Sequence, residues 1–374
     1  MDRYANTDDR PIGANKLSAS PAIAQEFEMS ETRSDRTRRT GDDLPEIPVV
    51  CCGRDFPLAT LTACTAEAHA LIDGATAGVP PSVLKLADRI SRRWLAKSDN
   101  AHLVEIDAIA AKLDQPGAHY LSVNYEWGCT VAVRANGGQP ELVRVLDWRT
   151  PGLGRYVVAA DVDGACGRFI TLTWPGYTGV LQATAPGRFA AALNQAPMPR
   201  RGGGFLPLDW FANKVDVWRS REATPAHLLR DVFEQAESFA EARRRLSETP
   251  IASPAIFSLV GCRAGELCII ERTEHATHVH DGARATANAW QAPVWSGRAR
   301  GADNAERVRQ LSVLPSAPTE NFDWLAPPVL NATTRLAAVF MPSTGKLLAQ
   351  GFAGEQPVTR TLSLPTASPR NGSA

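Results

Sequence analysis

The sequence has no long uninterrupted apolar run. Nowhere in its 374 residues does a stretch approach the roughly 18 to 20 apolar residues that a membrane-spanning helix needs. The first fifteen residues also lack the apolar core of a secretory signal, because acidic residues, Asn, Arg and Pro interrupt them. We therefore expect a cytoplasmic protein with no transmembrane segment.

The chain also has no excess of charge. Its 40 Lys and Arg residues balance 40 Asp and Glu residues, so the formal net charge is zero. Binding to nucleic-acid phosphates needs a clustered surplus of Lys and Arg. We therefore expect no nucleic-acid partner. The hydrophobic content of 44% is that of a globular chain with a sizeable core.

The seven cysteines form an odd number, and none of them is spaced as Cys-x-x-Cys. This pattern predicts neither a disulfide framework nor a tetrahedral metal site. His278 and His280 share one face of an expected strand and could suggest a metal site. Because no Cys lies nearby and no further ligand spacing is present, we expect no metal and no cofactor there.

Composition and periodicity divide the chain into four parts. Polar residues with few aromatics predict a disordered leader, apolar spacing of three to four predicts helices, and a period of two predicts strands. The parts are the leader 1–45, a helical segment 46–128 with helices near 57–74, 81–97 and 103–113, a mainly β region 129–356, and a loose tail 357–374.

The helical pattern 81–97 has one apolar face and one basic face. A basic amphipathic helix can make transient contact with a membrane surface. The same pattern fits a helix that packs its apolar face on the core and leaves its charged face in water, and we favour this second interpretation. The basic residues are Lys85, Arg89, Arg92, Arg93 and Lys97.

A hairpin is predicted around Asn136–Gly137, between strands 129–134 and 141–147. A turn centred between Gly137 and Gly138 places Cys129 opposite Leu146. Arg144 and Asp147 are three residues apart and lie on opposite faces of a regular strand. Both can reach Cys129 only if the strand is irregular near Asp147, for example at a bulge.

The rest of the β region predicts further hairpins with a helical insertion. Ser238 and Glu241 form a capping box at the start of one helix. Strands followed by helices and then more strands predict an α+β protein with two sheets and a helical layer. The expected strands are 155–162, 168–174, 179–183, 188–193, 255–260, 267–271, 275–280, a strand near 286, 336–341 and 347–351, and the helices are 225–235 and 238–246.

Several short motifs occur in a characteristic order. They are residues 105–110, 124–126, the run Arg144-Val145-Leu146-Asp147-Trp148, and residues 174–181, 186–189, 193–194, 254–257 and 265–266. Their order resembles the N-terminal nucleophile hydrolases of the acid ceramidase and N-acylethanolamine acid amidase type, which are related to choloylglycine hydrolases and penicillin V acylases. The resemblance implies an αββα four-layer sandwich preceded by a helical pro-segment.

The resemblance also implies that the chain cuts itself between Gly128 and Cys129 and that the two processed chains stay associated. The thiol of Cys129 would then be the nucleophile, and its new α-amine would be the base. An α-amine titrates near ~7.7 to 8.0 and a thiol near ~8.5, so the amine can accept the thiol proton near neutral pH. Gly128 has no Cβ, which eases attack on its carbonyl.

By the same resemblance, Arg144 would stabilise the thiolate and Asp147 would orient the amine. Asn194 and Asn288 would form the oxyanion hole, whose donors act where negative charge develops. The last polar partner in the family is an arginine shortly after the late Asn. Arg298 and Arg300 both fit that position, and we favour Arg300.

The implied activity is hydrolysis of a linear amide, with a fatty-acyl amide such as an N-acylethanolamine or a ceramide-like lipid as the small-molecule substrate. The apolar stretch 205–211 fits an acyl groove and fits a core segment equally well. Three alternatives remain: transfer of the acyl group to an amine, as in the acyltransferases that make penicillins; an inactive binding module; and a Cys/His hydrolase that uses one of the seven histidines.

Overall fold

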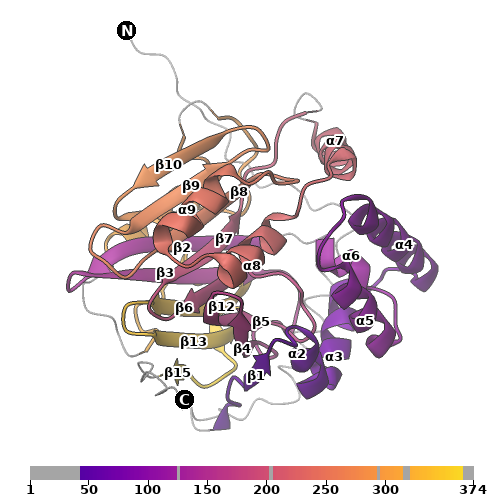
Figure 1. Cartoon of the computed structure of the whole chain (residues 1–374), viewed down its shortest axis with the longest axis horizontal. Helices are drawn as coiled ribbons and strands as arrows, with labels where there is room; N and C mark the ends of the chain where they lie inside the picture. The colour runs from indigo at the N-terminus through magenta and orange to yellow at the C-terminus, as the bar shows by residue number, and fades with distance from the viewer. Residues whose placement is uncertain (1–42, 124–126, 202–204, 293–294, 315–320, 365–374) are drawn as a thin grey trace.

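The computed structural model describes residues 43–123, 127–201, 205–292, 295–314 and 321–364. Two β-sheets lie face to face, and helices cover their outer faces (Figure 1). Residues 1–42 of the predicted disordered leader, the motif residues 124–126 and the last ten residues of the predicted tail lie outside the described residues.

The first sheet has eight strands in the order β1-β4-β5-β6-β7-β8-β9-β10. Strands β4 to β10 run antiparallel to their neighbours, whereas β1 pairs in parallel with β4. The strands are β1 Val49–Gly53, β4 Val158–Gly164, β5 Gly167–Thr173, β6 Gln182–Ala185, β7 Phe189–Gln195, β8 Ala255–Val260, β9 Leu267–Arg272 and β10 Thr277–Asp281.

The second sheet has seven strands, with the order β11-β2-β3-β12-β13-β14 and β15 paired to β13. Helix α10 (Asn304–Ser312) packs against β2 and β11 of this sheet, while α8 (Pro225–Gln235) and α9 (Phe239–Glu248) pack against the first sheet. The layers are therefore αββα, as expected. The strands are β2 Trp127–Asn136, β3 Gln139–Trp148, β11 Arg284–Thr286, β12 Thr334–Met341, β13 Lys346–Ala353, β14 Gln356–Pro357 and β15 Leu362–Leu364.

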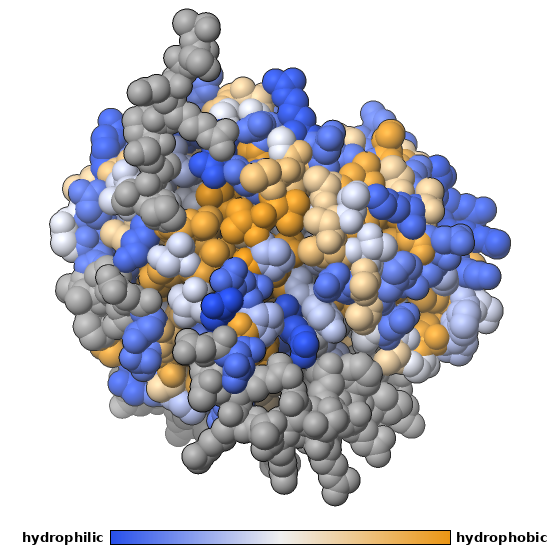
Figure 2. Space-filling model, turned by 90° about the horizontal axis from the view of Figure 1, so that it is seen from below, coloured by the Kyte–Doolittle hydropathy of each residue, from blue (hydrophilic) through white to orange (hydrophobic). Residues whose placement is uncertain are grey.

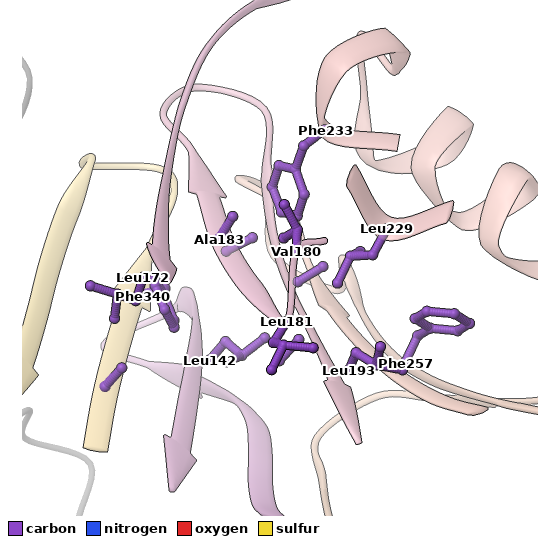
Figure 3. Packing of buried hydrophobic residues seen from close by; sticks show 14 of the residues in the cluster. Leu142, Leu172, Val180, Leu181, Ala183, Leu193, Leu229, Phe233, Phe257 and Phe340 are labelled. Carbon is purple, nitrogen blue, oxygen red and sulfur yellow. The ribbon is translucent and has the colours of Figure 1, made fainter. Parts of the chain in front are cut away.

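The main core fills the space between the sheets and beneath α8. Leu142 and Phe340 of the second sheet lie close to Leu172 of the first, and Leu229 and Phe233 point from α8 toward the strands (Figure 3). Burying each side chain of this size contributes about 1.5 to 3 kcal/mol. Alternate residues of β2 and β3 instead pack on the α10 side, in a second cluster. Each face of the hairpin is therefore buried.

Five helices of the N-terminal segment lie side by side at one edge of the sheets (Figure 1). They are α2 Leu58–Ala63, α3 Thr65–Thr76, α4 Pro81–Lys97, α5 Leu103–Leu113 and α6 Ala118–Val123. This segment was predicted to be helical throughout, but it begins with a strand, β1, that joins the first sheet. Main-chain hydrogen bonds of β1 with β4 thus attach the start of this segment to the first sheet.

Several other elements differ from the sequence prediction. Helix α6 follows the last of the three helices expected in the N-terminal segment, and α7 (Leu206–Arg219) lies in the mainly β region, where only helices 225–235 and 238–246 were expected. Strand β15 lies within the predicted loose tail and pairs with β13. Half of the capping box predicted for α9 is present: Ser238 Oγ accepts from Glu241 N at 3.3 Å, whereas the Glu241 carboxylate accepts from Glu237 N at 3.1 Å rather than from Ser238 N.

The surface seen from below carries a patch of apolar residues bordered by charged ones (Figure 2). No helix in the described parts of the chain combines the length and apolar character needed to cross a membrane.

Candidate active site

Cys129 lies near the start of β2 and is fully buried. Its side chain faces the space between the sheets, in the same cluster as Val131. Val131 pairs with Arg144 on β3, so Cys129 and Arg144 are diagonal neighbours on one face of the hairpin. Arg144 Nη2 donates to Cys129 Sγ at 3.0 Å. The strand register therefore brings a cation to the thiol.

The Arg144 guanidinium is only 1% exposed. Its other acceptors are neutral: Leu193 O at 2.8 Å and Asn194 Oδ1 at 3.3 Å. Guanidinium stays protonated in proteins, and a buried cation with neutral partners favours a negative charge beside it. Burial nevertheless raises the pKa of the Cys129 thiol to about 12, against the opposing effect of Arg144. The thiol of the continuous chain is therefore neutral near pH 7.

Asn288 contacts the backbone of Cys129. The amide nitrogen of Cys129, which belongs to the Gly128–Cys129 peptide, donates to Asn288 Oδ1 at 2.7 Å. The Asn288 Nδ2 group donates to Gln195 O at 2.7 Å, and Asn194 Nδ2 donates to Ala287 O at 3.1 Å. Asn288 thus contacts Cys129 directly and Asn194 contacts Arg144, while the NH2 group of each asparagine donates to a carbonyl. An NH2 group has two N–H donors, so a side-chain contact with an oxyanion would use the second donor.

Asp147 lies opposite Gly128 on the other face of the hairpin. Its carboxylate pairs with Arg307 of α10 and accepts from Thr334 Oγ1 at 3.0 Å and Asn331 Nδ2 at 3.1 Å. Burial raises the pKa of Asp147, and Arg307 acts in the opposite direction. A Cβ built on Gly128 would lie 3.6 Å from Asp147 Oδ2. Asp147 therefore flanks the peptide bond before Cys129.

The predicted irregularity in this hairpin is wrong. Cys129 does pair with Leu146 as expected, but β2 and β3 pair without a shift from Trp127 to Asn136. The register shift lies in the neighbouring strand β12, between Thr334 and Leu336. Arg144 and Asp147, three residues apart on a regular strand, therefore lie on opposite faces, and Asp147 points away from the thiol.

Arg307 was not identified from the sequence. The only local signal is an amphipathic pattern over residues 304–312, in which Arg307 and Leu311 are four apart and both buried. Of the two candidate arginines, Arg300 donates its backbone nitrogen to Asn288 O at 3.1 Å and its Nε to Ala196 O at 2.9 Å. Arg298 instead forms an isolated β-bridge with Met198. Arg300 is thus the one bonded to Asn288.

A pocket of about 130 Å³ adjoins this cluster. Its lining includes Trp127, Asn194 and Arg300. Trp127 is two residues before Cys129, and Asn194 accepts a hydrogen bond from Arg144. Most of the remaining lining is apolar. It comes from the end of β7 and the residues after it, from α7, from the first turn of α8, from residues 252–254 and from Val123 of α6. These further residues are Leu193, Gln195, Ala196, Pro197, Met198, Pro199, Trp210, Asn213, Lys214, Val217, Thr224, Pro225, Ala226, Ala252, Ser253, Pro254 and Glu274.

The sequence left open whether residues 205–211 line an acyl groove or form part of the core. Trp210 lines the pocket, whereas Phe205 and Phe211 are more than half exposed. The histidines make their described hydrogen bonds away from Cys129: His102 and His227 at the contact of α5 with α8, and His280 with Glu271.

No family model matches the chain. One segment is 36% identical over 105 residues to acid ceramidase from Homo sapiens and 34% identical over 104 residues to that from Heterocephalus glaber, which is 28% of this chain in each case. The predicted resemblance to acid ceramidases is confirmed over this segment. It spans about a quarter of the length of the curated relatives, 25% in both.

Solved structures match the chain in part. A Caenorhabditis elegans ortholog of N-acylethanolamine-hydrolyzing acid amidase has a TM-score of 0.46 at 21% identity, over 63% of this chain and 100% of that one. A mutant of the conjugated bile acid hydrolase from Clostridium perfringens has a TM-score of 0.37 at 9% identity, over 64% and 92%. Acid ceramidase and these neighbours all belong to the N-terminal nucleophile hydrolases.

Proposed function

We propose that this chain is a self-processing cysteine amidohydrolase that acts on linear amides. The observation that carries the proposal is the buried contact of 3.0 Å between Arg144 Nη2 and Cys129 Sγ. It stands beside the 2.7 Å bond from the Cys129 nitrogen to Asn288 Oδ1. The thiol thus lies beside a cation that no carboxylate neutralises, and the backbone nitrogen of the same residue is bound by the Asn288 side chain. Both contacts suit a nucleophile that is first buried within the chain and then becomes its new N-terminus.

In the processing step, Cys129 Sγ attacks the carbonyl carbon of Gly128. The sulfur–carbon bond forms, the carbon–nitrogen bond of the Gly128–Cys129 peptide breaks, and the thiol proton moves to the released nitrogen. Water then hydrolyses the thioester and frees a chain that begins at Cys129. Asp147 flanks Gly128, so its carboxylate is placed to hold the new ammonium group.

In the turnover step, the free α-amine takes the thiol proton and the thiolate attacks the substrate carbonyl. The acyl group passes to Cys129, the amine product leaves with the proton, and water releases the acid. Arg144 stabilises this thiolate, which forms in the processed chain and not in the continuous one. The α-amine, whose pKa is about 8, takes the place of the histidine base that other thiol hydrolases use.

The pocket supports an apolar acyl group. Its volume of about 130 Å³ is close to that of an engineered cavity of about 150 Å³ that holds benzene. The enclosed part therefore takes about six carbon atoms, and a longer chain extends beyond it toward α7. Ceramide, the substrate that the name acid ceramidase indicates, fits this pocket as a fatty-acyl amide, and an N-acylethanolamine would fit in the same way.

The test is release of amine from N-acyl amides of increasing chain length. The wild type and the exposed-cysteine control Cys51→Ala are expected to hydrolyse them, whereas Cys129→Ala is expected to release none. Adding a primary amine separates hydrolysis from transfer, because an acyltransferase would form the new amide instead of the acid. Full hydrolysis by Cys129→Ala would refute the proposal.

A further inference from the structure

A buried charged cluster joins the N-terminal segment to α8, and the proposed chemistry does not use it. Arg230 of α8 is 4% exposed and binds Glu105 of α5 through both terminal nitrogens, at 2.5 and 2.9 Å. Its Nε donates to Glu234 at 2.7 Å, and Nη1 and Nη2 also donate to Thr178 O and Phe56 O. Every terminal nitrogen of this guanidinium is therefore engaged, and Glu105 and Phe56 both belong to the segment before the proposed cut.

The residues next to Arg230 on α8 bind the same segment. Asp231 Oδ1 lies 3.1 Å from His102 Nε2. His227 Nδ1 lies 3.0 Å from Asn100 Nδ2, and its Nε2 lies 3.1 Å from Thr178 Oγ1. Three side chains of one helix thus hold residues 100–105.

The helix held in this way is also a wall of the pocket. Its first turn contributes Pro225 and Ala226 to the lining. On the other side, Trp94 Nε1 of α4 donates to the carbonyl of Val217 at 2.7 Å, and Val217 of α7 lines the same pocket. The N-terminal segment therefore contacts both helices that shape the pocket, and its own Val123 adds to the lining.

We propose that Glu105, Arg230 and Trp94 are positioning residues for acyl binding: through them the N-terminal helices, residues 58–123, act as a brace that fixes the two helices of the acyl pocket after the cut. The proposal rests on the proposed function, because it supposes a cut after Gly128. Without Glu105, Arg230 keeps only the carboxylate of Glu234, which lies on its own helix. Loss of Glu105 therefore breaks the charged contact between α5 and α8 and displaces the first turn of α8. None of the three residues touches Cys129 in its described bonds.

The test uses Glu105→Gln in the full chain. We expect cleavage into fragments of 128 and 246 residues as in the wild type, and a KM for a six- to eight-carbon acyl amide raised about tenfold, with kcat within about twofold. The KM for an acetyl amide is expected to stay unchanged, because an acetyl group does not fill the pocket. A general loss of stability would change the KM values for both substrates and would not raise only the one for the longer acyl amide. Glu105→Asp, which keeps the charge, is expected to recover most of the affinity.

The matched control is Arg92→Gln. Arg92 also binds a carboxylate through two nitrogens, but its partner Asp107 lies in the same segment and the pair is exposed; both KM values should stay at wild-type level. If Glu105→Gln does not fold, Trp94→Phe, which loses the bond to Val217, should raise the longer-chain KM two- to threefold. Unchanged KM values in a cut, active variant would overturn the brace and leave the proposed function standing. A wild type that neither cuts nor hydrolyses amides would overturn the proposed function itself.

Discussion

The two faces of the β2–β3 hairpin are equally buried but carry opposite electrostatic arrangements. On the face toward the first sheet, Arg144 contacts a thiol and neutral oxygens. On the face toward α10, Asp147 is paired with Arg307 and accepts two further hydrogen bonds. Strand alternation keeps the cation and the carboxylate apart, although they are three residues apart in sequence. The separation leaves the positive charge of Arg144 available to the sulfur.

Removing Arg307 is expected to have the largest effect. Arg307→Met leaves a buried carboxylate without its cation, and breaking such a pair costs about 3 to 5 kcal/mol of folding free energy. The pKa of Asp147, already raised by burial, should rise further. Urea denaturation measures the loss.

The double variant Arg307→Met with Asp147→Asn serves as the control for this experiment. It removes the unpaired charge and should recover a large part of the stability without recovering chain cleavage. Equal stability of Arg307→Met and wild type would show that the α10 face is not held by this pair.

Removing Arg144 tests the other face. Loss of one electrostatic donor of this kind typically lowers the rate about 100- to 1,000-fold, so Arg144→Met should lose that much kcat/KM in amide hydrolysis. The pKa of the Cys129 thiol, measured from the pH dependence of iodoacetamide labelling, should rise because the opposing cation is gone. Arg284→Met, at an exposed position bonded to Gln291, is the control. If Arg144→Met were as active as the wild type, Arg144 would have no part in the mechanism.

The α5–α8 contact is a third charged site, less buried than either face, and should respond to pH. Although burial opposes it, His102 and Arg230 lower the pKa of Glu105 to about 2. Its contribution is therefore present above about pH 4.5 and lost as the pH falls toward 2. Burial lowers the pKa of His102, but hydrogen bonds to Asp231 and Glu105 outweigh it and raise the pKa overall. That contribution is present below about pH 6.5 and lost as the pH rises.

The processed fragments should therefore bind each other most tightly between about pH 4.5 and 6.5. Size-exclusion chromatography of cut protein at pH 3, 5.5 and 9 measures the bound fraction. The effect should be modest, since Glu105 is partly exposed and solvent screens such pairs. Tighter association at pH 9 than at pH 5.5 would contradict this assignment of charges.

The smallest effect is expected from Gly128→Ala. The added Cβ would lie 3.5 Å from Asp147 Cβ and 3.7 Å from Asn288 Oδ1, which are ordinary contacts. Folding should be nearly unchanged, while attack on the more crowded carbonyl should slow chain cleavage severalfold. The half-time of cutting, followed by gel electrophoresis, measures this. Cleavage as fast as in the wild type would show that the site does not sense crowding at residue 128.

The hairpin register could be predicted from the sequence because its causes are local. The Asn136–Gly137 turn and the alternating strands fix the pairing of Cys129 with Leu146, and helices α5 and α8 were predicted to the residue from apolar spacing. The order of motifs also led to Cys129, Arg144, Asn194 and Asn288, which the structure brings together.

The remaining features depend on contacts between distant parts of the chain. Arg307 lies 160 residues after Asp147, and an ion pair at such separation leaves no local pattern. The bulge was expected in β3 but lies in β12, since it arises from packing beside a strand far along the chain. The polar contact of α5 with α8 is hidden for the same reason.

The central claim is that Cys129 becomes a chain terminus through its own thiol. Intact mass of purified wild type, beside Cys129→Ala, tests it most directly. We predict fragments of 128 and 246 residues for the wild type and one uncut chain of 374 residues for Cys129→Ala. A preparation that hydrolyses amides while its chain runs unbroken through residues 128 and 129 would contradict the account.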